Sequence, residues 1–226
     1  MYQARGVNQR IPEAMASRLR SEVRFGQAVK AIRATAAGTE VHTTDGSKYT
    51  AQACICALPF ATLREVDLEP ALTGVQARAV RTLPHQAIYQ IALQVERPFW
   101  EADGMEPSMW TDSHLGRVAA IYHGTGDDEV SSLVVSAFGP AALHLDRLGP
   151  DGAARHAVAE IERMRPAAKG ALTVTAQHSW TRDRHAGCAW SYFRPGTVTK
   201  FLPAMNAPHG RVHFCGEQTA LASRGM

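Results

Sequence analysis

The first periodic pattern of apolar and polar positions lies in residues 8–19 and predicts a helix. Ile11, Met15 and Leu19 recur at fourfold spacing, which places them on one helical face. Pro12 suits the first turn, where a backbone N–H has no partner within the helix.

Shorter apolar stretches follow and predict strands in residues 27–33, 39–44, 47–52 and 53–58. Asp45-Gly46 separates the second stretch from the third and is a strong hairpin signal. The fourth stretch is almost wholly apolar, so we expect a buried strand that ends at Pro59.

The middle of the chain predicts strands first and then a helix. Strands are expected in residues 89–95, 118–122, 131–138 and 172–180. Asp151 is expected to cap a helix that runs to Met164 and ends before Pro166. One face of it carries Ala154, Val158, Ile161 and Met164. This order of elements indicates a mixed sheet backed by helices.

Composition and charge narrow the class of protein. Of the 226 residues, 45% are apolar and 20% charged, and the formal net charge is +3. The Lys and Arg residues are scattered, whereas a nucleic-acid surface needs them on one face. No apolar run reaches the length of a membrane span, and the first residues carry no hydrophobic signal region. We therefore expect a cytoplasmic protein with neither nucleic acid nor a membrane as partner.

The cysteines and histidines show no metal-ligand spacing. Cys54, Cys56, Cys188 and Cys215 form no Cys-x-x-Cys pair, and the ten histidines contain no His-Glu-x-x-His. Cys54 and Cys56 are expected to face a core as reduced thiols. We therefore expect no metal site, and we interpret nearly all the histidines as surface or packing residues.

The end of the chain holds the densest set of candidate binding residues. Val212 to Cys215 predicts a short apolar strand, which Gly216 ends. A residue without a side chain lets a ligand or another backbone approach closely. The polar residues 217–219 follow at the carboxyl end of the strand, where open α/β sheets bind ligands. Residues 220–226 predict the approach to a helix, whose N-terminus would present N–H groups to an electron-rich ligand.

Two stretches carry more specific wording. The first is Gly210-Arg-Val-His-Phe-Cys-Gly-Glu-Gln-Thr-Ala220, followed by Arg224-Gly225-Met226. The second is Gly187-Cys-Ala-Trp-Ser-Tyr-Phe-Arg-Pro-Gly196, preceded by Trp180-Thr-Arg-Asp183. They resemble the C-terminal and the second flavin-side motifs of the flavin-containing amine oxidases, which include monoamine, polyamine and L-amino-acid oxidases. Ala57-Leu58-Pro59 and Arg97-Pro-Phe-Trp-Glu101 are similar to further phrases of that family, so the resemblance covers nearly all of the chain.

The resemblance implies an α/β (α+β) fold: an incomplete FAD-binding domain with an inserted substrate domain of a mixed sheet and helices. Residues 1–67 and 181–226 would form the FAD-binding part, and residues 68–180 the substrate-binding domain. The family begins with a Gly-x-Gly-x-x-Gly turn that holds the FAD pyrophosphate. Gly124-Thr-Gly126 lacks the third glycine and is interpreted as a polar loop. We therefore expect a C-terminal portion, whose N-terminal FAD-binding segment lies in the same parent chain or in a partner subunit.

The resemblance also implies the site residues. The cofactor-binding candidates are Ala28, Val29, Trp180, Cys188, Ala189, Gly216, Glu217, Thr219 and Met226. Gln90 matches the position where many members hold a water against flavin N5 with a lysine, and it is the catalytic candidate. The substrate-pocket candidates are Tyr122, Trp190 and Gly225. Cys188 falls where monoamine oxidases link the flavin covalently, although we favour noncovalent FAD here.

The implied function is FAD-dependent oxidation of an amine or amino acid C–N bond to an imine, with oxygen as acceptor and hydrogen peroxide as product. Ala189 and Gly225 match the positions of the monoamine oxidase aromatic cage, so a bulkier amine or an amino acid is the expected substrate class. Two alternatives stay open: a non-catalytic subunit that needs a partner chain for FAD, and another flavin oxidoreductase such as a desaturase. A homodimer also stays open.

Overall fold

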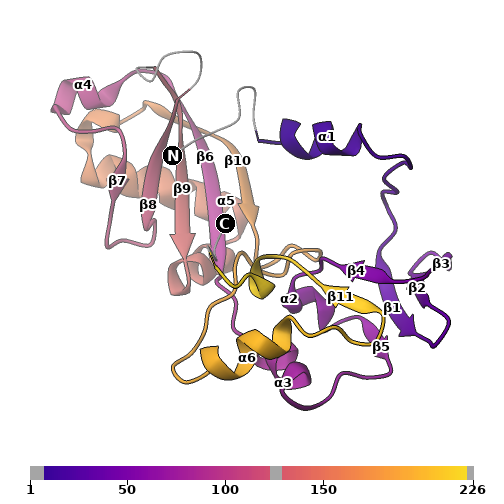
Figure 1. Ribbon diagram of the computed structural model, residues 1–226. Coiled ribbons are helices and arrows are strands. Elements are labelled where there is room, and N and C mark those ends of the chain that lie inside the picture. The colour runs from indigo at the N-terminus through magenta and orange to yellow at the C-terminus, as the bar shows by residue number, and fades with distance from the viewer. Residues whose placement is uncertain (1–7, 123–128, 223–226) are drawn as a thin grey trace.

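The structure, a computed structural model, describes residues 8–122 and 129–222. Its elements gather around two buried apolar clusters in an elongated molecule (Figure 1). The larger cluster lies between a five-stranded sheet and the long helix α5, and the smaller one lies among two small sheets and short helices. Segments from the beginning and the end of the sequence meet in the smaller cluster, as the indigo and yellow ribbons show.

The smaller cluster is enclosed by the sheets β3-β2-β1-β5 and β11-β4. Its elements are β1 (Val29–Ala34), β2 (Thr39–Thr43), β3 (Lys48–Ala51), β4 (Cys54–Cys56), α2 (Phe60–Leu63), β5 (Asp67–Glu69), α3 (Gly74–Thr82), α6 (Val198–Met205), β11 (Val212–Phe214) and the 3₁₀ helix η2 (Glu217–Thr219). Phe60, Leu83 and Met205 are fully buried in it.

The predicted hairpin is confirmed: β2 and β3 pair antiparallel around Asp45-Gly46. Gly46 has a φ of 91°, which glycine adopts without strain. The Asp45 carboxylate accepts hydrogen bonds from Thr43 Oγ1 at 2.6 Å and Ser47 N at 2.9 Å. These two bonds, the Thr43 one foremost, hold the pKa of Asp45 well below its usual range.

The strand predicted in residues 53–58 is shorter and less buried than expected. β4 pairs parallel with β11, and this two-stranded sheet covers the cluster with one face only. Cys56 points into the cluster, whereas Ile55 lies on the open face and is 75% exposed. The prediction of a buried strand is therefore wrong at Ile55, because an apolar run alone does not tell whether one face or both are covered. All four cysteines are free thiols.

The larger cluster lies against the sheet β10-β6-β9-β8-β7. Its elements are β6 (Ile88–Val95), α4 (Phe99–Asp103), β7 (Met109–Trp110), β8 (Arg117–Tyr122), β9 (Val130–Phe138), α5 (Pro140–Met164), the 3₁₀ helix η1 (Pro166–Ala168) and β10 (Leu172–Ser179). Neighbouring strands pair antiparallel. Tyr89, Ile91 and Leu93 of β6 alternate into the cluster, so Gln90, Ala92 and Gln94 face the other side of the sheet.

Helix α5 differs from its prediction at the N-terminal end. It begins at Pro140 and is interrupted at Gly149, whose φ of 68° and ψ of 171° are not helical. Pro150 then opens the second arm, and Asp151 lies in the first turn of that arm rather than capping the whole helix. The first arm was missed because its fully buried residues, Ala142 and Leu145, give too sparse a pattern.

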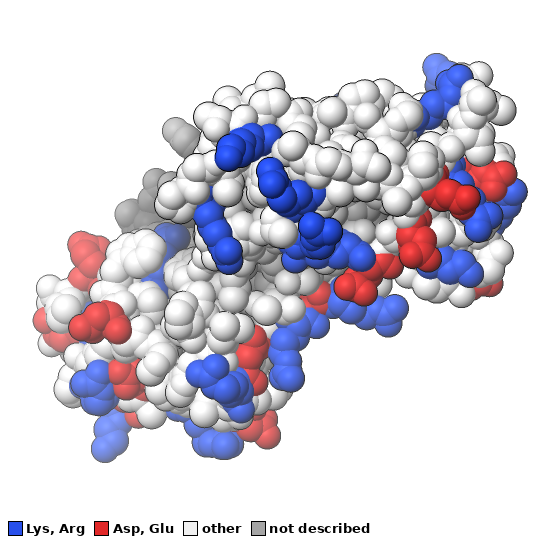
Figure 2. All heavy atoms as spheres, turned by 90° about the horizontal axis from the view of Figure 1, so that it is seen from below, with Lys and Arg blue, Asp and Glu red and all other residues white. Residues whose placement is uncertain are grey.

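The N-terminal helix α1 (Arg10–Ala16) is shorter than predicted and stands apart from both clusters (Figure 1). The predicted apolar face exists, but Ile11 and Met15 are 54% and 66% exposed. Among the described residues, none of the helices has the length and apolar character needed to cross a bilayer. Figure 2 shows that charges of both signs border each other at the ends of one face, with a group of basic side chains towards its middle.

Candidate cofactor site

The C-terminal motif forms a hydrogen-bonded turn at the carboxyl end of the parallel pair β4–β11. Gly216 has a φ of 113° and is exposed, and a Cβ there would lie 3.3 Å from the Gln218 amide. The Gln218 side chain is buried and donates from Nε2 to Leu58 O at 3.1 Å and Cys215 O at 3.2 Å. Thr219 Oγ1 donates to Gly216 O at 2.9 Å. These bonds hold open the backbone cradle at Gly216, where a ligand can approach.

Glu217 connects this turn to the second motif. Its carboxylate accepts hydrogen bonds from Ser191 N at 3.0 Å and from Ser191 Oγ at 3.0 Å. Ser191 is buried, and the acceptor is charged, so the contact belongs to the stronger class of hydrogen bonds. A carboxylate has more lone pairs than these bonds use, so Glu217 keeps capacity to accept from a ligand hydroxyl.

Residues 187–192 are fixed by backbone pairing to residues 84–86. Ala189 N donates to Gln86 O at 3.0 Å, Gln86 N donates to Trp190 O at 2.7 Å, and Tyr192 N donates to Pro84 O at 3.0 Å. This ladder places Cys188 and Ala189 next to the start of β6, between the two buried clusters.

Cys188 is buried and its thiol is poorly suited to react as a thiolate. Its Sγ donates to Ala186 O at 3.5 Å. Burial, followed by the negative charge of Glu217, raises the pKa of Cys188 to about 11, although the Arg64 charge opposes this. The thiol is therefore protonated near neutral pH.

His85 lies beside the same group. Burial, together with the positive charge of Arg64, lowers the pKa of His85 to about 4, although Glu217 opposes this. Its Nε2 is buried without a hydrogen-bond partner among the described residues. Arg64 itself donates to Val80 O and Leu83 O, which ties α2 to α3 behind the site.

Gln90 and Trp180 are joined directly. Trp180 Nε1 donates to Gln90 Oε1 at 2.8 Å, and Gln90 Nε2 donates to Ser136 Oγ at 3.5 Å. Strand pairing sets Gln90 in a polar row across the sheet with His178, Ser136 and Arg117. This row lies on the face opposite to Tyr89 and Ile91, and hence away from α5.

Aromatic side chains border this region. The ring of Trp190 lies 6.0 Å from that of Phe138, and Phe138 stacks at 6.4 Å on Trp110. Tyr122 lies away from these aromatic side chains. It pairs with Val130, and six residues of β9 separate Val130 from Ser136, which is roughly 20 Å at 3.3 Å per residue.

The remaining predicted residues lie in or beyond the smaller cluster. Ala28 O accepts from Thr44 N at 2.8 Å at the start of β1, and Val29 packs against the cluster that contains Phe214. Gly225 and Met226, like Gly124-Thr-Gly126, lie outside the described residues.

Sequence reasoning missed the partners of the predicted residues. Ser191, which binds Glu217, was quoted inside the second motif without a role, and Ser136 was hidden in an apolar strand. His85 and Arg64 carry no local pattern that distinguishes them from other histidines and arginines. The sequence does offer one signal for Ser191. It is a small polar residue between two aromatic residues, in a motif whose neighbouring residues pair with residues 84–86 through their backbone.

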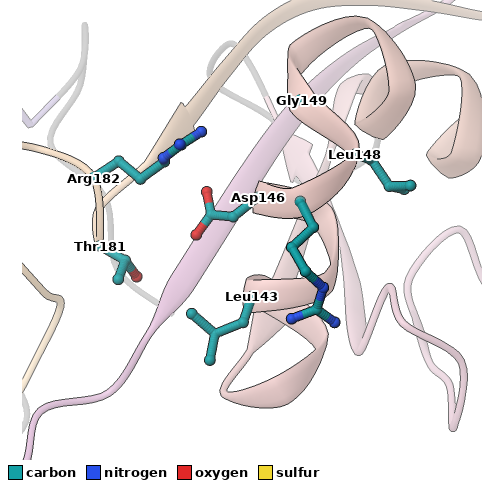
Figure 3. A pocket seen from close by; sticks show the side chains of 7 residues that line it. Leu143, Asp146, Leu148, Gly149, Thr181 and Arg182 are labelled. Atoms are coloured by element: carbon teal, nitrogen blue, oxygen red, sulfur yellow. The ribbon is translucent and has the colours of Figure 1, made fainter.

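A separate open pocket of about 580 Å³ lies between the first arm of α5 and the chain after β10 (Figure 3). Leu143, Asp146, Thr181 and Arg182 are among the residues that line it. Asp146 Oδ1 and Thr181 Oγ1 are buried without hydrogen-bond partners among the described residues. This pocket is distinct from the turn at Gly216.

A parallel strand pair that ends in an exposed glycine and a carboxylate is a place where α/β proteins bind ligands. The fold is that of the flavin-dependent amine oxidases. The family model "Flavin containing amine oxidoreductase" matches residues 1–226, and the chain belongs to this family.

Known proteins similar to the chain agree with this assignment. It is 25% identical over 220 residues to "Amine oxidase [flavin-containing]" of Danio rerio, which covers 96% of this chain and 42% of the relative. It is 23% identical to "Putative L-amino-acid oxidase YobN" of Bacillus subtilis, which covers 100% of this chain and 49% of the relative. The chain thus spans about half the length of these curated relatives.

Solved structures show the same fold. A redesigned putrescine oxidase superposes with a TM-score of 0.84 at 18% identity, covering 97% of this chain and 49% of the other. Cyclohexylamine oxidase from Brevibacterium oxydans gives a TM-score of 0.71 at 20% identity, covering 86% and 43%. The predicted fold class and family are therefore confirmed.

Proposed function

We propose that this chain forms the C-terminal part of an FAD-dependent oxidase that converts an amine or amino acid C–N bond to an imine, with oxygen as acceptor and hydrogen peroxide as product. The observation that carries the proposal is the bond between Glu217 and Ser191, because it joins the two flavin-side motifs at one turn. Family membership supports the reaction class.

Bound FAD would supply the redox chemistry by accepting a hydride equivalent from the carbon beside the substrate nitrogen. The chain's own residues would bind the FAD and orient it. Gly216, Glu217 and Thr219 would hold the ribityl and phosphate end, Ala28 and Val29 the adenine, and Trp180 and Ala189 the ring. The Gln90 amide, already oriented by Trp180 and Ser136, would hold a water without adding a charge.

We propose that the FAD pyrophosphate is held by a segment outside these 226 residues, in the same parent chain or a partner subunit. The half-length match to the relatives supports this. We further propose that residues 1–67 and 181–226 form the flavin-binding part and residues 68–180 the substrate part. The two buried clusters support the division, although α3 packs with the flavin-side cluster.

The test is peroxide formation by purified protein that contains this chain and its flavin, measured with a peroxidase-coupled assay on monoamines, diamines and L-amino acids. We expect amine-dependent peroxide and anaerobic bleaching of the flavin absorbance. Bleaching without peroxide would indicate an acceptor other than oxygen. A flavin that no amine or amino acid reduces would contradict the proposal and favour a desaturase-type reaction or a non-catalytic role.

Glu217→Gln tests the site itself. The change keeps the shape but removes the charge that accepts two hydrogen bonds from Ser191, so we expect about tenfold weaker flavin retention, equivalent to ~1.4 kcal/mol. Glu65→Gln, at an exposed position after α2, is the matched control and should retain flavin like the unchanged protein. Equal retention by both variants would remove Glu217 from the site.

A further inference from the structure

Three histidines from separate segments meet at one point in the part of the molecule that contains the larger cluster. His114 lies in the turn between β7 and β8, His144 in the first arm of α5 and His156 in the second arm. One ring nitrogen of each lies within 4.8 Å of the corresponding nitrogens of the other two. The ring centroids are 4.1 Å apart for His114 and His144, 5.5 Å for His144 and His156, and 5.9 Å for His114 and His156.

The kink in α5 makes this cluster. Twelve residues separate His144 from His156, and a straight helix would carry them about 18 Å apart along its axis at 1.5 Å per residue. The non-helical Gly149, followed by Pro150, redirects the second arm, and the two rings come together across the bend. Figure 3 shows the ribbon leaving the first arm at Leu148 and Gly149. No spacing rule applied to the sequence could have shown this pair.

The third histidine is held in place by its own turn. Thr111 N donates to Gly116 O at 2.8 Å, Ser113 N donates to Thr111 Oγ1 at 2.8 Å, and Leu115 N donates to Ser113 Oγ at 3.2 Å. Leu115 is fully buried and anchors the turn in the larger cluster. His114 is therefore presented to α5 by a fixed backbone, while its exposed ring leaves an opening to solvent.

One nitrogen atom of the cluster is buried without a partner. His156 Nε2 is buried and makes no hydrogen bond within the described residues, a condition that costs free energy unless something binds it. His144 is partly buried, as His156 is, and its ring contacts the rings of both other histidines.

Three imidazoles are a donor set that Zn²⁺, Cu²⁺ and Ni²⁺ accept, and three protein ligands leave a fourth position for water. In a tetrahedral site with bonds of about 2.05 Å, the nitrogens are about 3.3 Å apart. The stacked rings of His114 and His144, whose planes lie 19° apart, therefore have to turn about their side-chain bonds before both lone pairs point at one ion. We propose that His114, His144 and His156 bind one divalent transition-metal ion, Zn²⁺ in the first instance, which ties the β7–β8 turn to both arms of the kinked helix.

The test uses the whole chain, freed of metal by a chelator. Titration with Co²⁺ should give one equivalent of binding with the visible bands of a tetrahedral site, and Zn²⁺ should displace it stoichiometrically. His114→Ala, His144→Gln and His156→Gln should each weaken Zn²⁺ binding by more than about 100-fold, because even outer-shell partners of a metal are worth about 10–100-fold. His213→Gln, at an exposed position in β11, is the matched control and should bind as the unchanged chain does.

His114→Ala decides the question even where a helix variant fails to fold, since His114 is exposed on a turn. Circular dichroism checks that its fold is unchanged. Zn²⁺ should raise the Tm of the unchanged chain and of the His213 variant but not that of His114→Ala. The absence of stoichiometric binding by the unchanged chain, or full binding by His114→Ala, would overturn the proposal.

Discussion

At the residue scale, Gly187 explains why the second motif opens with glycine. It has a φ of 66°, and a Cβ there would lie 3.3 Å from Ala61 Cβ on α2. Gly187→Ala should destabilise the chain by about 1–3 kcal/mol, because alanine is strained in the left-handed backbone conformation and its Cβ would crowd α2. Gly196→Ala is the matched control: its φ is 73°, but nothing lies within 4 Å, so strain alone should cost about 1 kcal/mol. If both variants lose the same free energy of unfolding in urea, α2 moves away from the added Cβ at no cost.

Cys188 decides between covalent and noncovalent flavin. Its pKa is raised to about 11, chiefly by burial, so the thiol is protonated near neutral pH and is a poor nucleophile. We expect acid precipitation of the flavin-loaded protein to release all the flavin into solution, and Cys188→Ala to keep its flavin before acid treatment. Flavin absorbance that stays with the precipitate, and disappears in Cys188→Ala, would establish a thioether link.

The sequence indicated single residues better than their partners. Gly216 and Glu217 stand in a motif, so they could be found without a structure. Ser191 and Ser136 could not, because their contacts depend on where two distant segments align: Ser191 meets Glu217 across 26 residues, and Ser136 meets Gln90 across 46. The second pairing follows from strand register, which apolar patterns fix only in part, and the first depends on how two loops meet.

At the element scale, one buried ion pair fastens α4 to the end of α5. Arg165 is buried, and it donates to both oxygens of Asp103, at 2.8 Å from Nε and 2.6 Å from Nη2. Asp103→Ala leaves this guanidinium without its charge partner. We expect a loss in Tm at least about threefold larger than that of Arg33→Ala, which breaks an exposed pair with Glu69.

The same pair gives a pH dependence with a definite sign. The hydrogen bonds from Arg165 lower the pKa of Asp103 in the folded chain below its ordinary value. The stabilisation is therefore complete above the ordinary carboxyl range and is lost as pH falls through the lowered folded value. The stability gap between the unchanged chain and Asp103→Ala should be constant from pH 6 to 7, within about 0.5 kcal/mol, and should shrink below about pH 4. A gap that stays constant in acid would contradict this.

Element prediction succeeded where burial alternates and failed where it does not. Four strands of the five-stranded sheet were found to within one or two residues, because positions such as Tyr89, Ile91 and Leu93 alternate with half-buried ones. The two-residue β7 was not predicted. The short helices α2, α3 and α6 went unrecognised, since four to nine residues give too few turns for a helical period. The kink at Gly149 was missed because the pattern restarts at Pro150.

At the scale of the whole molecule, the two buried clusters are joined by polar and backbone contacts rather than by a shared apolar core. The ladder between residues 84–86 and 189–192 and the bond between Glu217 and Ser191 lie at this junction. The polar row that contains Gln90 belongs to the sheet face away from α5. A site between two such bodies can combine binding residues from both, which is a common location for ligand sites.

Substitutions of two methionines test which parts of the chain contribute to the stability of the fold. Met205 of α6 is fully buried in the smaller cluster, whereas Met15 of α1 is 66% exposed. Met205→Ala should lower the free energy of unfolding by about 2–5 kcal/mol, because it leaves a cavity. Met15→Ala removes the same atoms from a helix that touches neither cluster, and it should change that free energy by no more than about 0.5 kcal/mol. Urea unfolding of both variants provides the comparison. A loss of unfolding free energy at Met15 close to the loss at Met205 would mean that α1 packs against the rest of the chain in solution. The apolar face of α1 would then stabilise the fold of this chain itself.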